Sequence, residues 1–409
     1  MSLTSLGLWA GVLALAVAST VCVLPLALPR LMEIWARGGG AERLRIGLAF
    51  AALGVLGMAA LALATGAEGQ GRTAALGLGT AALAGPGAAL SAQQRAVLAA
   101  GPWLNTPPLR AQDLRGKVVL VNFWTYSCIN SLRVLPYVRA WAEKYRAEGL
   151  VVVGVHTPEF EFEKDLANVR RASASYGVDY PVVLDSHFHV WRAFNNEAWP
   201  ALYFLGSDGR VRRQVLGEGS YDQSERLIQK LLSEANGRPV GGAITLVTGE
   251  GAEAAPDERD LGSPETYIGY GRASGFASPG GLKHDERRTY RGDISLGLNR
   301  WSLAGLWTAG DEFATLDQAS GRIAYRFHAR DLHLILGPSA DGRPVRFRIT
   351  IDGKAPGADH GVDVDAGGLG RVVEPRMYQL VRQARPVVAR TFEIEFLDAG
   401  VRAYDFTFG

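Results

Sequence analysis

The sequence predicts an α/β unit that follows two transmembrane helices and precedes an all-β sandwich. Three observations support this order. The N-terminal region holds long apolar runs without charge, the middle region alternates strand-like runs with amphipathic helical segments, and the last third places apolar residues at every second position. With 409 residues, the chain is long enough for several separate hydrophobic cores.

Two apolar runs near the N-terminus are long enough to cross a membrane. Residues 6–28 contain no charged residue, and a helix of that length spans the ~30 Å hydrocarbon layer. A second apolar run covers residues 46–64, and the loop between the runs carries four arginines. Because positively charged loops stay in the cytoplasm, both ends of this helix pair face outward. We predict a two-helix membrane anchor over residues 1–70, in contact with membrane lipid.

This topology places the later domains outside the cell membrane. We expect this to be a bacterial inner membrane, with the later domains in the periplasm. Residues 71–100 are rich in Ala and Gly and predict a flexible tether. Two alternatives stay open. One alternative is that residues 6–28 are a cleaved signal peptide. The other is that residues 73–90 form a further membrane span, which would put the later domains in the cytoplasm.

Residues 101–236 show the alternation of a compact α/β domain. Apolar runs predict five strands, at residues 118–124, 150–156, 182–184, 201–205 and 211–216. Helical periodicity predicts three helices, at residues 130–147, 162–176 and 221–235. The order is βαβ followed by ββα, with a hairpin turn at residues 207–209. Residues 237–262 have the composition of a linker.

In the last third of the chain the apolar period changes to two. Tyr325 and Phe327 alternate with polar residues, and turn signals recur without a helical segment. This pattern predicts a β-sandwich over residues 263–409. Trp301, Trp307 and Tyr325 either fill its core or stack on sugar rings, and the alternation favours the core.

Charge and cysteine content exclude several functions. The net charge is +2 and no basic block is present, so we expect no nucleic-acid partner. The two cysteines, Cys22 and Cys128, cannot build a disulfide framework. His187 and His189 would share a face of a strand, but no further ligand clusters with them. We therefore predict neither a metal nor a cofactor.

Cys128 has the sequence context of a reactive thiol. It follows an apolar run that ends in an aromatic pair, and it precedes a predicted helix. A sulfur at a helix N-terminus meets unpaired backbone N–H groups and the positive end of the helix dipole, which stabilise a thiolate. We therefore expect Cys128 to be a nucleophile in thiol–disulfide exchange. The alternative is a small buried hydrophobic residue.

Ser131 stands at the third position after Cys128, where a dithiol pair has its second cysteine. A serine hydroxyl has no accessible thiolate-like form, so Ser131 cannot attack a mixed disulfide and release the partner. We expect an outside thiol to release it.

These features resemble the thioredoxin superfamily, in which a proline kinks the active-site helix and a cis-proline loop packs against the sulfur. Pro136 and the pair Trp199–Pro200 stand at the matching places. Residues 101–236 are similar to the TlpA-type thioredoxins. The resemblance implies an α/β thioredoxin fold for this domain.

The motifs Trp124-Thr-Tyr-Ser-Cys-Ile-Asn and Gly154-Val-His-Thr-Pro-Glu resemble the periplasmic part of the DipZ-type cytochrome c biogenesis proteins. In that family the region after the linker is a β-sandwich that is carbohydrate-binding-module-like. The resemblance implies electron transfer from a membrane domain to extracytoplasmic disulfides. The chain departs from the family at Ser131 and in its membrane part, which has two predicted helices and the single cysteine Cys22.

The resemblance also implies a set of site residues. Those with a predicted catalytic role are Cys128, Ser131, Glu159 and Pro200. Those expected to contact the substrate are Trp124, Tyr126 and Trp199. Glu159 would move a proton during exchange, although a solvated surface role stays open. Asn122 stands where thioredoxins carry a buried aspartate, so this strand offers no carboxylate.

We predict a membrane-anchored, monothiol thioredoxin-like oxidoreductase whose partner is a disulfide- or thiol-bearing extracytoplasmic protein. Two alternatives remain open. Thr125-Tyr-Ser-Cys128 resembles the Thr-x-x-Cys of one-cysteine peroxidases of the redoxin (AhpC/TSA) type, although Val121 stands where those proteins have a proline. The other alternative is a non-catalytic protein that holds a partner, or a glycan at the β-sandwich.

Overall fold

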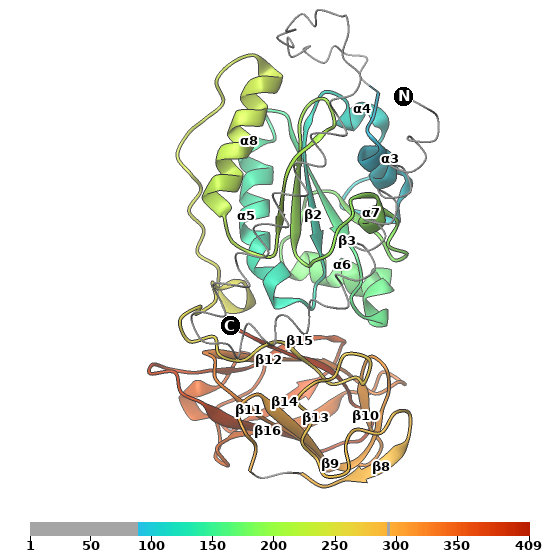
Figure 1. The fold of residues 1–409 in the computed structure, drawn as a ribbon, viewed down its shortest axis with the longest axis vertical. Helices are drawn as coiled ribbons and strands as arrows, with labels where there is room; N and C mark the ends of the chain where they lie inside the picture. The colour runs from blue at the N-terminus through green and yellow to red at the C-terminus, as the bar shows by residue number, and fades with distance from the viewer. Residues whose placement is uncertain (1–88, 293–294) are drawn as a thin grey trace, which may run out of the picture. The chain divides into compact units, whose positions relative to one another are not determined.

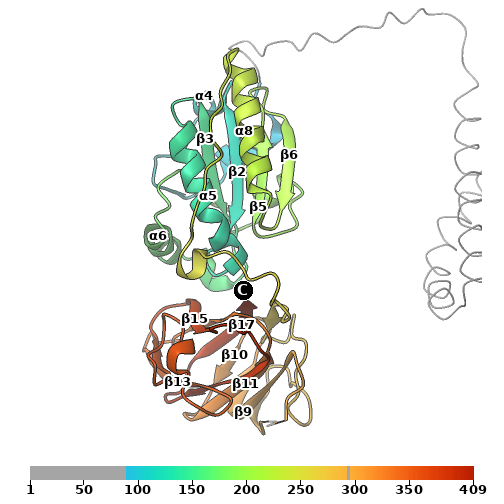
Figure 2. The same cartoon turned by 90° about the vertical axis from the view of Figure 1, so that its left-hand side faces the viewer.

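The computed structural model describes residues 89–292 and 295–409. The two predicted transmembrane helices, Cys22 and residues 71–88 of the predicted tether lie outside these residues. The prediction of a flexible tether is wrong for residues 92–99, which form a helix that begins at an N-cap on Ser91. Within the described part, none of the helices combines the length and the apolar character that a membrane span requires. The described chain contains an α/β domain and an all-β C-terminal domain, joined by a linker (Figures 1 and 2).

A six-stranded sheet forms the centre of the α/β domain, in the order β1-β4-β3-β2-β5-β6. Its strands are β1 Trp103–Leu104, β2 Val118–Trp124, β3 Leu150–His156, β4 Val182–Leu184, β5 Ala201–Leu205 and β6 Val211–Leu216. Strand β2 pairs in parallel with β3 and antiparallel with β5. The five predicted strands are confirmed, whereas β1 is too short to show a period in the sequence.

Helices cover both faces of this sheet (Figure 1). They are α3 Ala92–Ala99, α4 Ala111–Leu114, α5 Ile129–Tyr145, α6 Leu166–Ser175, α7 His189–Ala193 and α8 Tyr221–Asn236. Leu120 and Trp124 of β2 belong to the apolar cluster that contains α5 and α8. Val119 and Phe123 belong to the cluster on the other face, with α3 and α7. Alternate residues of one buried strand therefore serve two cores.

The helix predicted over residues 162–176 is divided in the structure. A short 3₁₀ turn, Glu161–Lys164, comes first. Asp165 then adopts an extended conformation, and its carboxylate accepts hydrogen bonds from the backbone N–H groups of Ala167 at 2.7 Å and Asn168 at 3.1 Å. An N-cap residue must leave the helical conformation, so α6 begins after Asp165.

The prediction that His187 and His189 share a strand face is wrong. His189 begins the short helix α7. The cause is Asp185, whose carboxylate accepts from the backbone N–H groups of Val190 at 3.0 Å and Trp191 at 2.8 Å. These bonds satisfy N–H groups that the start of a helix leaves unpaired. The sequence pattern did not show that Asp185 would start a helix here.

The C-terminal domain is all-β, as predicted. Its strands are β7 Thr266–Tyr267, β8 Arg287–Tyr290, β9 Arg300–Ala309, β10 Ala314–Leu316, β11 Gly321–Phe327, β12 Asp331–Gly337, β13 Val345–Ile351, β14 Leu369–Val372, β15 Arg376–Arg382, β16 Arg390–Phe396 and β17 Arg402–Phe408. They form one continuous sheet, where two separate sheets were predicted. The long strand β9 joins its halves, because it pairs with β11 before Gly305 and with β10 after it.

The aromatic residues of this domain fill its core. Trp301, Trp307 and Tyr325 are fully buried in one apolar cluster with residues from both halves of the sheet. The core interpretation of these rings is therefore confirmed. No ring face is left on them for a sugar to stack on.

A buried carboxylate ties α5, α8 and the linker together. Glu225 of α8 accepts hydrogen bonds from Trp141 at 3.1 Å, from Lys144 and Tyr145 at 2.7 Å each, and from the backbone N–H of Thr245 at 2.7 Å. Burial raises the pKa of Glu225, but these bonds outweigh it and lower the pKa to about 2. Their contribution to stability is present above the ordinary glutamate pKa and is lost as pH falls toward 2.

We expect Glu225→Gln to destabilise the chain by about 2 kcal/mol at pH 7, because charged hydrogen bonds become neutral or lose their acceptor. Urea unfolding followed by tryptophan fluorescence measures this loss. Glu234→Gln is the matched control, since Glu234 lies on the same helix and its carboxylate is 4.0 Å from exposed Lys230. The control should change stability by less than about 0.5 kcal/mol. Equal effects of the two substitutions would contradict the role of Glu225.

Candidate thiol site

Cys128 lies at the N-terminus of α5, in the turn that follows β2. Its backbone is extended and its carbonyl accepts the first helical hydrogen bond, from the N–H of Leu132 at 3.1 Å. The sulfur lies 4.0 Å from the carbonyl oxygen of Trp199, and the Trp199–Pro200 peptide is cis. The structure thus brings three of the predicted site residues together at one end of the sheet.

Ser131 supports the sulfur from within the same helix. It is fully buried, and its polar groups lower the pKa of Cys128. Its hydroxyl also accepts from the backbone N–H of Thr125 at 3.4 Å. Ser131 therefore holds the thiol turn in place in addition to replacing a second thiol.

The acidity of Cys128 differs from the sequence expectation. Only 5% of the residue is exposed. Burial raises its pKa well above the ordinary range, and the nearby carboxylates of Glu159 and Glu265 raise the pKa further, whereas the hydrogen bonds from Ser131 lower it by less. The expectation of a stabilised thiolate is therefore wrong for this arrangement, in which the thiol is protonated at neutral pH.

Glu159 is held by the C-terminal domain. Its Oε1 accepts hydrogen bonds from the hydroxyl of Tyr267 at 2.6 Å and from Nη1 of Arg272 at 2.8 Å. Only 5% of its side chain is exposed. The open alternative of a solvated surface residue is therefore wrong, and the predicted catalytic role remains a prediction.

Glu163 is a site residue that the sequence reasoning missed. It is fully buried, and Oε1 accepts from the hydroxyl of Ser127 at 2.5 Å and its backbone N–H at 3.3 Å. Oε2 accepts from the backbone N–H groups of Glu159 at 2.6 Å and Phe160 at 3.1 Å. One carboxyl group therefore joins the thiol turn to the Glu159 turn, and burial raises its pKa to about 7. In the sequence it stands between Phe162 and Lys164 in an acidic run, which gave no signal of its burial.

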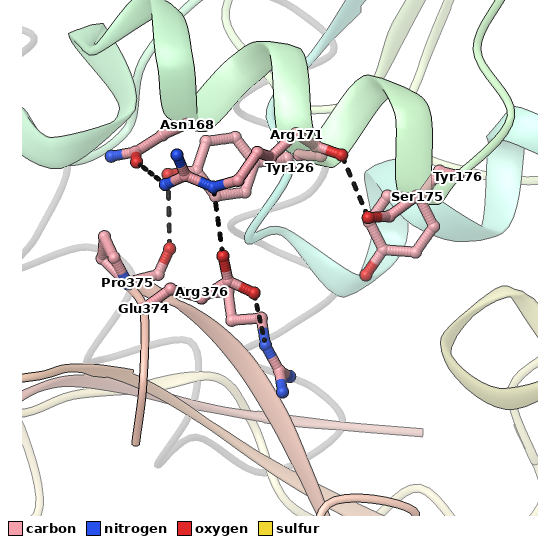
Figure 3. Close-up of a pocket in the computed structure, with 9 residues that line it drawn as sticks. Tyr126, Asn168, Arg171, Ser175, Tyr176, Glu374, Pro375 and Arg376 are labelled. Carbon is pink, nitrogen blue, oxygen red and sulfur yellow. Dashed lines mark hydrogen bonds and ion pairs between the residues drawn. The ribbon is translucent and has the colours of Figure 1, made fainter. Parts of the chain in front are cut away.

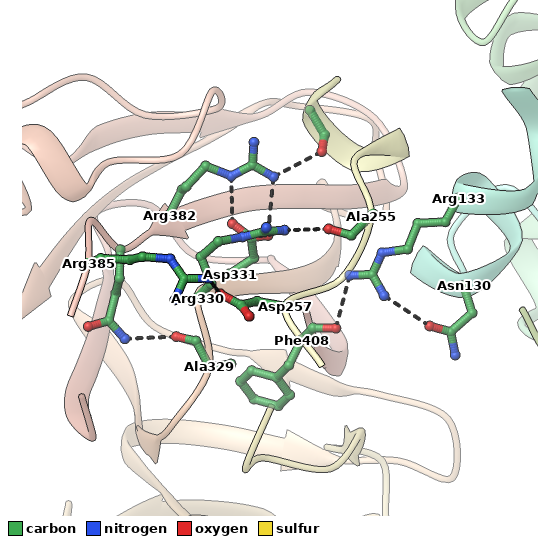
Figure 4. Close-up of polar contacts among 12 residues, drawn as sticks. Asn130, Arg133, Ala255, Asp257, Ala329, Arg330, Asp331, Arg382, Arg385 and Phe408 are labelled. Atoms are coloured by element: carbon green, nitrogen blue, oxygen red, sulfur yellow. Dashed lines mark hydrogen bonds and ion pairs between the residues drawn. The ribbon is translucent and has the colours of Figure 1, made fainter. Parts of the chain in front are cut away.

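The C-terminal domain packs against the thiol end of the α/β domain. The rings of Phe160 and Phe162 lie 5.2 and 4.9 Å from the ring of Tyr404. Arg133 of α5 donates to the carbonyl oxygen of Phe408 at 3.3 Å (Figure 4). Within the α/β domain it also donates to Glu218 at 3.1 Å. Apolar and polar contacts therefore hold the two domains together.

Tyr126, a predicted substrate contact, is engaged by the C-terminal domain instead. It is 3% exposed, and its hydroxyl donates to the carbonyl oxygen of Pro375 at 3.3 Å. It lines a cavity of about 240 Å³ between α6 and the loop before β15. In this cavity Arg171 of α6 pairs with Glu374 at 3.3 Å (Figure 3).

The other two predicted substrate contacts have different surroundings. Trp124 is fully buried against His156, so it is a core residue with no surface for a substrate, and that prediction is wrong. Trp199 is partly buried; its Nε1 donates to the carbonyl oxygen of Thr157 at 2.9 Å, and its ring lies 4.4 Å from that of Trp191. Its contact with a substrate remains a prediction.

The fold and the position of the cysteine define a thioredoxin-like protein with its thiol at the start of the active-site helix. Residues 94–214 match the AhpC/TSA family, and residues 263–409 match the family described as Thioredoxin like C-terminal domain. The chain is 36% identical over 259 residues to Protein DipZ of Mycobacterium tuberculosis, which is 61% of this chain and 36% of DipZ.

The chain is also 30% identical over 132 residues to the thiol-disulfide oxidoreductase YkuV of Bacillus subtilis, which is 32% of this chain and 88% of YkuV. A solution structure of a thioredoxin-like protein in the oxidised form shares 30% identity with a TM-score of 0.30, covering 32% of this chain and 88% of the other. The chain belongs to the thioredoxin-like family that includes DipZ, and it spans little more than a third of the DipZ length.

We expect Arg272→Ala to loosen the contact between the two domains and to open the route to Cys128. Loss of a hydrogen bond to a charged group costs about 1.5 kcal/mol, which raises an open population by about tenfold. The measurement is the rate of Cys128 modification by a polyethylene-glycol maleimide divided by the rate with N-ethylmaleimide. Both reagents need the same thiolate, so their ratio reports access.

The control for this experiment is Arg346→Ala, because the ion pair of Arg346 with Asp398, at 2.8 Å, lies within the C-terminal domain. We expect the ratio to rise in Arg272→Ala and to stay unchanged in Arg346→Ala. A ratio that is the same in all three proteins would show that the domain contact does not limit access.

Proposed function

We propose that the chain is a membrane-anchored thiol–disulfide oxidoreductase that acts on extracytoplasmic disulfides through the single thiol of Cys128. The observation that carries the proposal is the sulfur at the N-terminus of α5, 4.0 Å from the carbonyl of Trp199. A partner chain in extended conformation would bind along such a loop through its backbone groups. Relatives named DipZ and thiol-disulfide oxidoreductase support the same activity.

The proposed reaction begins with loss of the Cys128 proton. The sulfur then attacks one sulfur of the substrate disulfide. The bond from Cys128 to the substrate forms, the substrate disulfide breaks, and its electron pair goes to the leaving sulfur, which takes up a proton. Ser131 has no thiol for the next step, so an outside thiol must attack the mixed disulfide and release Cys128 as a thiol.

We expect the mixed disulfide at Cys128 to be long-lived and Ser131→Cys to shorten its lifetime by orders of magnitude, because a well-placed second thiol has an effective concentration of up to ~10⁵ M. Non-reducing gels of substrate adducts measure the lifetime. A reduction assay with an external thiol measures turnover. Cys128→Ser is the control, and it should form no adduct. Unchanged disulfide reduction in Cys128→Ser would refute the proposed function.

A one-cysteine peroxidase is the second candidate, because residues 94–214 match the AhpC/TSA family and Thr125 precedes Cys128 by three positions. The contacts of Thr125 do not favour it. Its hydroxyl lies 3.5 Å from Nε2 of His156, and burial raises the pKa of the thiol. We expect stopped-flow oxidation of Cys128 by hydrogen peroxide to be no faster than oxidation of free cysteine at the same pH. A much faster reaction would favour the peroxidase.

We also propose that the C-terminal domain binds a glycan. The sequence argument for this relied on aromatic rings, whereas the structural argument relies on a polar cavity. The large aromatic residues of this domain are buried. The sheet of this domain does carry a cavity of about 460 Å³, lined by small and polar side chains that include Ser302, Arg322 and Glu393. Hydroxyl groups of a glycan would hydrogen-bond to such a lining.

A further inference from the structure

Glu163 joins two turns of the α/β domain at the thiol site. Its Oε1 accepts hydrogen bonds from the hydroxyl of Ser127 at 2.5 Å and from the backbone N–H of Ser127 at 3.3 Å. Its Oε2 accepts from the backbone N–H groups of Glu159 at 2.6 Å and Phe160 at 3.1 Å. Ser127 directly precedes Cys128 in the chain. A movement of the Glu163 carboxyl group is therefore passed to the backbone that carries the sulfur.

These four contacts all come from donors, namely three backbone N–H groups and one hydroxyl. A backbone N–H cannot accept a hydrogen bond, so only an ionised Glu163 satisfies all four donors at once. A protonated Glu163 has the Ser127 hydroxyl as its acceptor, and that hydroxyl must then turn its own hydrogen away. Because Glu163 is fully buried, water does not replace a lost contact. The geometry of the thiol turn therefore depends on the charge of Glu163.

The turn at the other end of this carboxyl group is held by the C-terminal domain. The side chain of Glu159 accepts from the hydroxyl of Tyr267 at 2.6 Å and from Arg272 at 2.8 Å, so the Glu159 turn can serve as an anchor for the thiol turn. On its other side, the sulfur lies 4.0 Å from the carbonyl oxygen of Trp199. The contacts of Glu163 therefore bear on how the sulfur lies against the loop along which an extended partner chain would bind.

Glu163 changes its charge near neutral pH. Burial raises its pKa to about 7, against the lowering effect of the hydrogen bond from Ser127. The other ionisable groups on its own segment, on the thiol turn and on β17 are Glu159, Glu161, Lys164, Tyr126 and Tyr404. Burial raises the pKa of both tyrosines, so their rings stay neutral near pH 7.

We propose that Glu163 is a positioning residue for the attack of Cys128 on a disulfide in an extended chain, an inference that rests on the proposed function. Ionised Glu163 holds the thiol turn so that the sulfur lies beside the Trp199 carbonyl. Proton uptake by Glu163 weakens its hold on the N–H of Ser127, and the sulfur loses the position that a bound partner requires. The chemistry of the exchange is the same in both states: one S–S bond forms, another breaks, and the leaving sulfur takes a proton from water.

The test compares two disulfides in the full chain as a function of pH. One joins two copies of a short peptide that has blocked ends and no titratable side chain. The other is hydroxyethyl disulfide, which has no peptide backbone. Both are attacked by the same Cys128 thiolate, so the ratio of their rate constants, followed by mass spectrometry of the adducts, is independent of the thiolate fraction. We expect the peptide rate to gain on the order of tenfold in this ratio as pH rises, with a midpoint at about pH 7.

Three variants assign this midpoint. Glu163→Gln keeps the size of the side chain and removes its charge, so we expect a low ratio that does not change with pH. Ser127→Ala removes a hydrogen bond that lowers the pKa of Glu163, so the midpoint should move to higher pH by about one unit. Glu161→Gln is the matched control, because Glu161 lies on the same 3₁₀ turn and its exposed side chain pairs with Lys164. Its ratio should follow that of the wild type.

A wild-type ratio that does not change with pH refutes the positioning role, and this measurement needs no substitution. A ratio that still titrates in Glu163→Gln also refutes it. If Glu163→Gln fails to fold, Ser127→Ala decides, because an unchanged midpoint there would mean that Glu163 is not the titrating group. A wild-type chain that forms no adduct with either disulfide refutes the proposed function itself.

Discussion

The contact between the two domains determines the chemistry of this chain. The rings of Phe160 and Phe162 meet Tyr404 in an apolar seam, and this seam places acidic side chains of the C-terminal domain beside Cys128. Because Cys128 is buried, electrostatic interactions with its sulfur are stronger than they would be in water. The reactivity of the cysteine thus depends on residues more than a hundred positions away in the sequence.

Two opposing effects act on the sulfur, and their magnitudes decide the outcome. The N-terminus of α5 stabilises a thiolate, but a helix terminus stabilises a nearby charge by only about 0.3–1 kcal/mol at exposed positions. One unit of pKa corresponds to about 1.4 kcal/mol. Burial and the carboxylates of Glu159 and Glu265 shift the pKa of Cys128 upward by more than the helix end and Ser131 lower it. A helix N-terminus alone is therefore a poor guide to thiol acidity when a second domain covers it.

The sequence predicted what depends on local pattern and missed what depends on long-range contact. Buried strands such as Val118–Trp124 were placed correctly because a short, wholly apolar run of that length is typical of a buried strand. The break before α6 was missed because Asp165 reads as one more polar residue of an amphipathic segment. Cys128 and Pro200 came from motifs, whereas the role of Glu163 exists only after folding. No spacing rule connects a buried acid after β3 to the thiol turn before α5.

The protonated resting thiol fits the absence of a second cysteine at position 131. A monothiol site that attacks every disulfide it meets would remain in mixed disulfides, since it has no internal group to release them. Burial of Cys128 keeps its thiolate fraction low. The carboxylates of Glu159 and Glu265 raise the pKa of the same thiol further and so disfavour the free thiolate. A low thiolate fraction slows attack on disulfides that meet the site by chance.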